Sequence, residues 1–314
     1  MKLEISNIIN NFFLFLFILF PAILFSHSVL INEFMASNSE TIEHPPGSEI
    51  FPDWIELYNT SEKEINLKGF FLSDKETNPL KWKFPNVIIQ PKSFLLIFAS
   101  DEGFNPEQID KQDPKNPFLL HTNFKISNEG ETILFSDQSG LLLEKIEAKE
   151  IQKNHSFGRK TDSSSEWVFY ENSSPGFSNN DYFGYGEYCS PPNFSHIGGF
   201  YKNPFSLSLQ SENSNYKIYY SLNGTDPDEA STIFAQDIEI TKTTVIKART
   251  FQKDSLPGKI VTHSYIFFNR EVTLPVVSLA TDPENLWSKE KGIYIKGESF
   301  PTEESILFGT IQAI

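Results

Sequence analysis

Cysteine is almost absent from this chain, since Cys189 is the single one among 314 residues. A lone cysteine cannot form an intrachain disulfide, and it leaves no cysteine pair for a zinc site. We interpret Cys189 as a free thiol without a function of its own. A redox or crosslinking role is the alternative.

Clusters of positive charge are also missing. The formal net charge is −15, and the 26 lysines and arginines form no run or stripe. Nucleic acid and anionic membrane surfaces are bound through clustered cations that displace counterions, so we expect neither as a partner. An acidic surface suits basic or divalent-cation partners, or simply solvent.

Signatures of catalysis are scarce as well. The six histidines show no metal-ligand spacing, and the chain has neither a G-x-S-x-G elbow nor a glycine-rich phosphate loop. Asp53, Glu56 and Asp74 are candidates for paired acids, although hydrogen bonds at turns and strand ends explain them better. The sequence therefore predicts no catalytic residues, no metal site and no cofactor.

One uncharged apolar stretch lies near the N-terminus. Residues 12–25 (FFLFLFILFPAILF) are 14 residues long, whereas a helix that spans a bilayer needs about 20 apolar residues. Ser26 and Ser28 fit a cleavage site, so we predict a signal peptide over residues 1–28 and an exported mature chain without a membrane span. An uncleaved membrane anchor is the alternative.

Short strands dominate the chain after residue 28, as expected for a protein with 30 phenylalanines. Ile55 and Leu57 alternate with Glu56, residues 94–98 form a continuous apolar run, and residues 133–143 fit a strand, a turn and a strand. Residues 29–179 thus predict one antiparallel sandwich of roughly seven to nine strands.

A linker and a second β module come next. Residues 180–195 are rich in Tyr, Gly, Ser and Pro, which is typical of a linker. Residues 196–268 alternate again, and the strand at 216–222 runs into Asn223-Gly224, a tight-turn pair. Residues 223–228 (NGTDPD) could instead hold calcium, but a plain turn explains them better. The last helix signal is Thr281-Asp282-Pro283-Glu284.

The first module resembles a lamin-tail domain of the secreted bacterial kind. Six segments carry the resemblance: residues 29–36 (VLINEFMA), 53–59 (DWIELYN), 67–74 (LKGFFLSD), 126–131 (ISNEGE), 156–159 (SFGR) and 174–179 (SPGFSN). The resemblance implies an immunoglobulin-like sandwich without catalytic residues. It implies no role in a nuclear lamina, because the heptad rod of a lamin is absent.

The second module resembles the small β-sandwich at the C-terminus of chitobiases. The matching segments are residues 199–201 (GFY), 204–208 (PFSLS), 218–227 (IYYSLNGTDP), 238–240 (IEI) and 244–248 (TVIKA). This resemblance points to sugar rings as ligands, with Tyr201, Tyr219 and Tyr220 as possible carbohydrate contacts. Core packing is the alternative for these tyrosines, and Tyr219 and Tyr220 must face opposite sides of their strand.

Residues 274–287 (LPVVSLATDPENLW) and 292–297 (GIYIKG) resemble the opening of a CotH-type (spore-coat H) kinase domain. We expect residues 274–314 to be a truncated N-terminal piece of such a domain, without its nucleotide and metal ligands. The sequence thus predicts an all-β chain, an immunoglobulin-like lamin-tail sandwich followed by a second, smaller β-sandwich. Its expected role is non-catalytic binding to an unknown protein or polysaccharide at the cell surface. An incomplete CotH-type kinase and a carbohydrate-binding protein are the alternatives.

Overall fold

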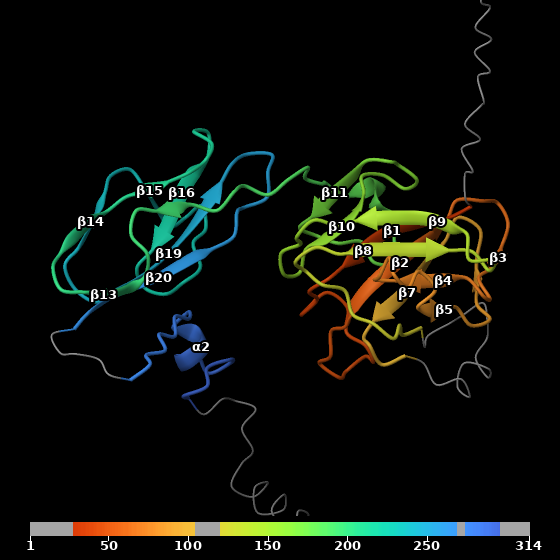
Figure 1. Cartoon of the computed structure of the whole chain (residues 1–314), viewed down its shortest axis with the longest axis horizontal. Helices are drawn as coiled ribbons and strands as arrows, with labels where there is room; N and C mark the ends of the chain where they lie inside the picture. The colour runs from red at the N-terminus through yellow and green to blue at the C-terminus, as the bar shows by residue number, and fades with distance from the viewer. Residues whose placement is uncertain (1–27, 104–119, 269–273, 296–314) are drawn as a thin grey trace, which may run out of the picture.

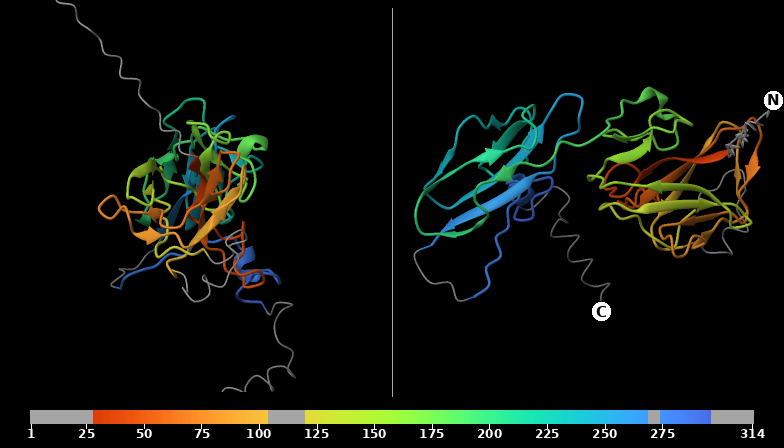
Figure 2. Two further views of the ribbon diagram at one scale, coloured as in Figure 1. Left: turned by 90° about the vertical axis from the view of Figure 1, so that its right-hand side faces the viewer. Right: turned by 45° about the horizontal axis from the view of Figure 1, so that its top comes forward.

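The computed structural model describes residues 28–103, 120–268 and 274–295. Two β-layered bodies lie end to end and are joined by the segment around residue 185 (Figures 1 and 2). The predicted all-β class is therefore confirmed. The expected signal peptide, apart from Ser28, and residues 296–314 of the expected kinase piece lie outside the described residues.

The described residues of the first module form eleven strands and a short 3-10 helix η1 (Asn179–Asp181). Its strands are β1 (Val29–Met35), β2 (Asp53–Asn59), β3 (Ile65–Asn66), β4 (Phe71–Ser73), β5 (Trp82–Lys83), β6 (Ile88–Ile89), β7 (Phe94–Ala99), β8 (Thr132–Ser136), β9 (Leu142–Glu147), β10 (Ser156–Arg159) and β11 (Trp167–Tyr170). One sheet has the order β11-β10-β1-β2-β7 and the other β5-β4-β8-β9, with β3 paired to β6.

These sheets enclose one apolar core, and the alternation predicted for β2 is confirmed. Ile55 and Leu57 are fully buried in that core. Glu56 lies between them and therefore points to the opposite face of the sheet. That face carries a smaller apolar cluster of Met35, Trp54 and Phe98. Strands of this sheet are thus buried on both faces, which explains the continuous apolar run in β7.

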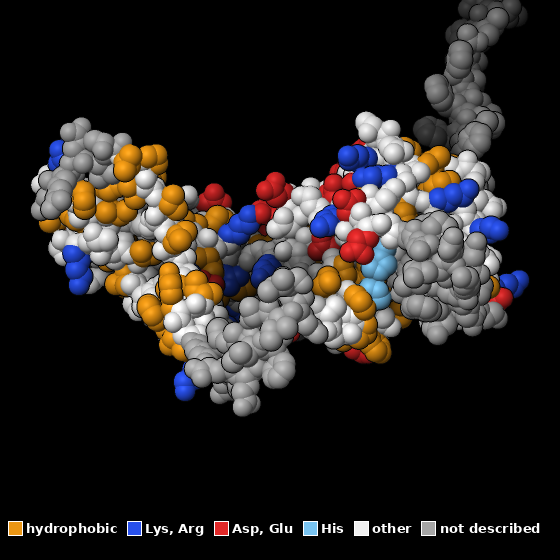
Figure 3. Space-filling view, turned by 90° about the horizontal axis from the view of Figure 1, so that it is seen from below, with side chains coloured by type: hydrophobic (Ala, Val, Ile, Leu, Met, Phe, Trp, Pro, Cys, Tyr) orange, Lys and Arg blue, Asp and Glu red, His pale blue; other side chains and the backbone are white. Residues whose placement is uncertain are grey.

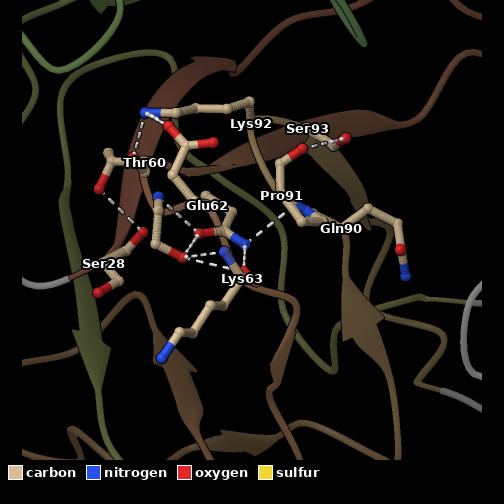
Figure 4. Close-up of polar contacts among 10 residues, drawn as sticks. Ser28, Thr60, Glu62, Lys63, Gln90, Pro91, Lys92 and Ser93 are labelled. Atoms are coloured by element: carbon tan, nitrogen blue, oxygen red, sulfur yellow. Dashed lines mark hydrogen bonds and ion pairs between the residues drawn. The ribbon is translucent and has the colours of Figure 1, made fainter.

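Asn59 is the last residue of β2, and its side chain holds the turn that follows this strand. Its Nδ2 donates to the carbonyl of Lys63 at 2.7 Å and to that of Gln90 at 3.0 Å. Lys92 reaches back and donates to the carbonyl of Thr60 at 2.6 Å (Figure 4). A buried amide thus satisfies several backbone groups and holds the turn in place.

The second module contains nine strands. They are β12 (Asn193–Phe194), β13 (Gly199–Tyr201), β14 (Phe205–Leu207), β15 (Leu209–Gln210), β16 (Lys217–Ser221), β17 (Thr232–Ile233), β18 (Ile238–Ile240), β19 (Thr244–Phe251) and β20 (Val261–Phe267). The main sheet has the order β13-β20-β19-β16-β17, and the pairs β14-β18 and β12-β15 accompany it. Its core is much smaller than the first one.

The tight-turn pair Asn223-Gly224 does not close a two-residue hairpin. Gly224 has the positive φ of 88° that the pair favours. The next strand, β17, starts only at Thr232, so the pair opens a longer connection. Asn223 Oδ1 accepts from Thr225 Oγ1 at 2.7 Å and stabilises that loop locally. The turn lies where the pair predicts it, but the strand that pairs with β16 lies further along the chain.

The segment predicted as a linker is tied to both modules. Tyr185 and Phe169 exchange two backbone hydrogen bonds of 2.8 Å, which attaches the segment to β11. Four residues later, the N–H of Cys189 donates to the carbonyl of Leu256 at 2.8 Å. The side chain of Leu256, only 1% exposed, packs into the core of the first module. The second module thus contributes a residue to the first core.

Polar side chains complete this junction. Tyr188 Oη lies 2.9 Å from His155 Nδ1, and the two rings are stacked. Gln152 donates to the carbonyl of Pro257 at 2.8 Å and accepts from Arg249 at 3.0 Å. Burial lowers the pKa of His155 to about 4, so its ring is neutral at pH 7. The junction is therefore an apolar contact surrounded by satisfied hydrogen bonds.

Residues 274–295 lie beside the second module and contain the helix α2 (Glu284–Trp287). Ser278 Oγ donates to Ser264 Oγ of β20 at 2.8 Å. The predicted helix start is confirmed within one residue, because Asp282 accepts from the N–H of Glu284 at 2.8 Å.

Candidate functional site in a groove between the modules

The three tyrosines expected as sugar contacts do not share a surface. Tyr201 and Tyr220 pack against the core of the second module. Tyr201 lies 4.4 Å from the Phe205 ring, between centroids, and its hydroxyl donates to the carbonyl of Ile197 at 2.7 Å. Tyr219 points to the outer face of the main sheet, as the alternation of β16 requires. Of the three, Tyr219 alone lies on that face.

A groove lies beside this outer face and combines aromatic and polar side chains. It has a volume of ≈ 620 Å³ and runs along the junction. Its aromatic walls are Tyr185 of the joining segment and Phe251 of β19. Its polar lining comprises four carboxylates, two amides, two lysines and a serine: Glu171, Asp228, Glu229, Asp254, Asn215, Gln252, Lys217, Lys253 and Ser255.

Phe251 is held in place by its neighbours on the outer face. The Tyr219 ring meets it edge to face, with 5.3 Å between centroids. The Arg249 guanidinium lies 5.7 Å from the centroid of the Phe251 ring. Arg249 is itself fixed, because its Nε donates to the carbonyl of Gly258 at 2.6 Å. An aromatic wall that is fixed in this way loses little side-chain freedom when a ligand stacks on it.

The carboxylates of the groove are potential hydrogen-bond acceptors for a ligand. A hydrogen bond from Ser231 is the main reason that the pKa of Asp228 is lower than usual, so Asp228 is charged at pH 7. Asp254 lies at a turn with a φ of 65°. Aromatic faces together with carboxylates and amides suit a hydroxylated ligand, which offers both apolar C–H faces and O–H donors.

The loop at residues 223–228 behaves as a turn in this structure. Asp226 pairs with Lys247 at 2.7 Å, and Asp228 accepts from Ser231 and Ala230. Within the residues that the structure describes, no group of three or more His, Cys, Asp or Glu side chains is placed to hold a metal ion.

The favoured interpretation of the candidate acids, a hydrogen bond at a strand end, is confirmed for Asp53, whereas Asp74 has an ion pair instead. Asp74 forms an ion pair with Lys81 at 2.7 Å, and Asp53 accepts from the backbone N–H of Asn38 at 3.1 Å. Glu56 also accepts a backbone hydrogen bond, from Gly176 at 2.5 Å. It is nevertheless part of a carboxylate pair that the sequence pattern did not reveal.

Glu56 lies opposite Glu33 on adjacent strands, and both side chains are fully buried. Burial raises the pKa of Glu33 to about 7. Burial and the charge of Glu33 also raise the pKa of Glu56 well above its usual value. Shifts of this size occur at catalytic sites and in structural networks alike.

The surroundings of the pair decide between these roles. Ser174 donates to Glu33 through both its backbone N–H and its hydroxyl, the latter at 2.8 Å. Asn32 donates to Glu56 at 3.0 Å. Residues 174–176 thus cover the two carboxylates, so the pair holds this segment against the sheet. A charged residue within the apolar segment 29–36 was the signal that could have revealed Glu33.

Cys189 is buried as well, and burial raises the pKa of its thiol. A thiol that stays protonated is a poor nucleophile. Both facts agree with the interpretation of Cys189 as an inert residue.

The fold and the groove define a chain of two consecutive β-sandwich modules. Residues 26–150 match the family model of the Lamin Tail Domain, and residues 197–262 match that of the Chitobiase/beta-hexosaminidase C-terminal domain. Both are non-catalytic β-sandwich types. The sequence matches none of the curated proteins.

Two of the three predicted resemblances are thereby confirmed. Neither family model extends beyond residue 262, so the resemblance of residues 274–297 to a CotH-type kinase stays a prediction. Among the described residues, no helix is long and apolar enough to cross a membrane.

Proposed function

We propose that this protein is an exported, non-catalytic binding protein of the cell envelope or exterior, and that the groove between its modules is its binding site. The observation that supports the proposal is the groove itself. Its walls come from the joining segment and from β19, and Leu256 anchors the two modules to each other at its base. Two modules fixed in this way present one continuous surface.

Carbohydrate is the ligand class that the groove favours. Tyr185 and Phe251 supply aromatic faces, and carboxylates and amides surround them. The match of residues 197–262 to a domain named after chitobiase and beta-hexosaminidase supports the same class. In this proposal Tyr219 acts indirectly, by holding Phe251, whereas Tyr201 and Tyr220 belong to the core.

Retention on insoluble polysaccharides tests the proposal. The protein is mixed with chitin, cellulose and peptidoglycan, and the bound fraction is measured for wild type and for Phe251→Ala. We expect at least one matrix to retain wild type. We expect Phe251→Ala to bind about tenfold more weakly, because one stacked aromatic ring contributes about that much to the affinity. Phe200→Ala is the matched control, because Phe200 is 50% exposed on the distant edge strand β13 of the same sheet.

Equal retention of Phe251→Ala and wild type, at unchanged melting temperature, would exclude the groove as the sugar site. A wild type that binds none of the three matrices would exclude this ligand class among them. Export is tested separately, by N-terminal sequencing of the protein recovered from its own cells. A start near Val29 supports it, and an intact N-terminus contradicts a cleaved signal.

The alternative of an incomplete CotH-type kinase depends on residues 274–297 alone. The intact mass of the protein recovered from its own cells decides between the two functions. A mass that fits residues 29–314 supports the binding protein. A much larger mass favours the kinase, and phosphotransfer would then be assayed on that longer form.

A further inference from the structure

A second cleft lies at the loop end of the lamin-tail module, away from the groove between the modules. It has a volume of ≈ 800 Å³ and opens between the loop before β2 and the chain around β7. Its apolar walls are Pro45, Pro46, Ile50, Phe51 and Pro52. Figure 3 looks onto this end of the molecule, where histidine side chains lie at the surface beside hydrophobic and acidic ones.

Two imidazole rings form the inner side of this cleft. The His44 ring stacks on Phe98 with 4.2 Å between centroids, and the His121 ring lies 4.9 Å from His44. Ser100 Oγ is 2.9 Å from His121 Nδ1, which orients that ring. Burial lowers the pKa of both histidines, so the rings are neutral at pH 7.

The wall loop is fixed before any ligand arrives. The Glu43 carboxylate accepts from the N–H of Gly47 at 2.8 Å and also from that of Glu49. The N–H of His44 donates to the carbonyl of Ile50 at 2.8 Å and closes the loop. A cleft that is held open by its own hydrogen bonds spends little binding energy on ordering.

Asp53 places a carboxylate in this largely apolar cleft. Burial raises the pKa of Asp53 to about 6, which means that its charge lacks full compensation. Among the described residues, the other charged groups of the lining are Glu102 and Lys125, so this part of the lining carries a net negative charge while the histidines are neutral. A cation beside Asp53 would supply the missing compensation.

We propose that this cleft binds a primary ammonium group carried on an unbranched apolar stem. The ammonium group lies against Asp53, and the stem lies along the proline and imidazole walls. An apolar stem gains from this lining, whereas a small hydrated cation gains nothing from it. A free alkylamine and a lysine side chain of a partner polypeptide share this chemistry.

The affinity for such a ligand should change with pH, because the cleft contains ionisable groups. Asp53 is faced by the backbone N–H groups of Asn38 and Ile126 and by Lys125. At pH 5 about nine tenths of Asp53 is protonated if its pKa is about 6. Any charge that His44 and His121 gain on acidification repels the ammonium group as well. We therefore expect affinity to fall about tenfold or more from pH 7.5 to pH 5.

The test is a titration of the full chain with hexylammonium, followed through the imidazole C–H resonances of His44 and His121. Hexanol is the control ligand, since it has the same stem without the charge. We expect saturable shifts with hexylammonium and tenfold weaker binding at pH 5. Nα-acetyl-lysine methylamide, titrated in parallel, separates the sources. Tighter binding than hexylammonium points to a polypeptide side chain, and weaker binding points to a free amine.

Asp53→Asn removes the charge and keeps an oxygen that accepts from Asn38. We expect this variant to lose at least about tenfold in affinity at pH 7.5, whereas Glu40→Gln, an exposed acid outside the cleft, changes nothing. Equal binding of hexanol and hexylammonium overturns the proposal, as does unchanged affinity in a folded Asp53→Asn. If Asp53→Asn does not fold, wild-type affinity that is the same at pH 5 and pH 7.5 overturns it.

Discussion

The burial of Glu33 makes the stability of the folded protein depend on pH. Its carboxylate is 0% exposed, and its pKa is raised from 4.5 to about 7. The folded state therefore binds a proton that the unfolded state releases between these two pH values. The stability that comes from the protonated form is complete below about pH 4.5 and is lost as the pH rises through 7.

We expect this loss to appear in the free energy of unfolding. A pKa difference of this size corresponds to about 3 kcal/mol at most, lost between pH 4.5 and pH 8. Urea unfolding of the Glu33→Gln variant at both pH values should show a weaker pH dependence than wild type. The exposed Glu40→Gln variant serves as control and should keep the dependence. Identical slopes for Glu33→Gln and wild type would show that Glu33 does not titrate in this range.

At the scale of single elements, the joining segment is shaped by close backbone contacts. A Cβ added to Gly258 would lie 2.3 Å from Thr250 Oγ1 and 2.8 Å from the carbonyl oxygen of Cys189. Gly186 has nothing within 4 Å of such a Cβ. Two glycines near the same junction therefore have opposite tolerance for a side chain.

We expect Gly258→Ala to destabilise the protein by about 1–3 kcal/mol, because the added methyl group must displace backbone at the junction. Gly186→Ala should change stability by less than about 0.5 kcal/mol. Chemical denaturation of the two variants beside wild type measures the difference. Similar stabilities for both variants would mean that the junction can relax around Gly258.

At the scale of the whole molecule, Leu256 couples the two modules. It belongs to the second module in sequence, yet it packs in the core of the first. Its removal should therefore weaken the first module, although that module keeps its full sequence.

We expect Leu256→Ala to cost about 2–5 kcal/mol, as for other leucines removed from a core. Amide exchange should accelerate in β10 and β11 of the first module as well as in β19. Leu222→Ala, which removes a leucine that is 52% exposed in the same module, should leave both regions unchanged. Faster exchange confined to the second module would argue against coupling through Leu256.

The sequence by itself determined the all-β class, the two faces of β2 and the order of the modules, although the first module has eleven described strands where seven to nine were predicted. Ile55, Glu56 and Leu57 alternate at the period of two that every strand imposes, and this signal is local. The same locality explains why the start of α2 was predicted from Asp282 and Pro283. Family resemblance added the identity of the two modules, because it rests on short segments in a fixed order.

Only the tertiary structure decided where functional surfaces lie. The lining of the groove combines Glu171, Tyr185, Asn215 and Phe251, which are separated by up to 80 positions (251 − 171) in the chain. Glu33 lies beside Glu56 because β1 pairs with β2 in this register, and Leu256 of the second module packs in the core of the first. Local patterns determine the face of the strand to which a side chain points. Which distant residues lie next to that side chain depends on how the strands pair and how the loops pack.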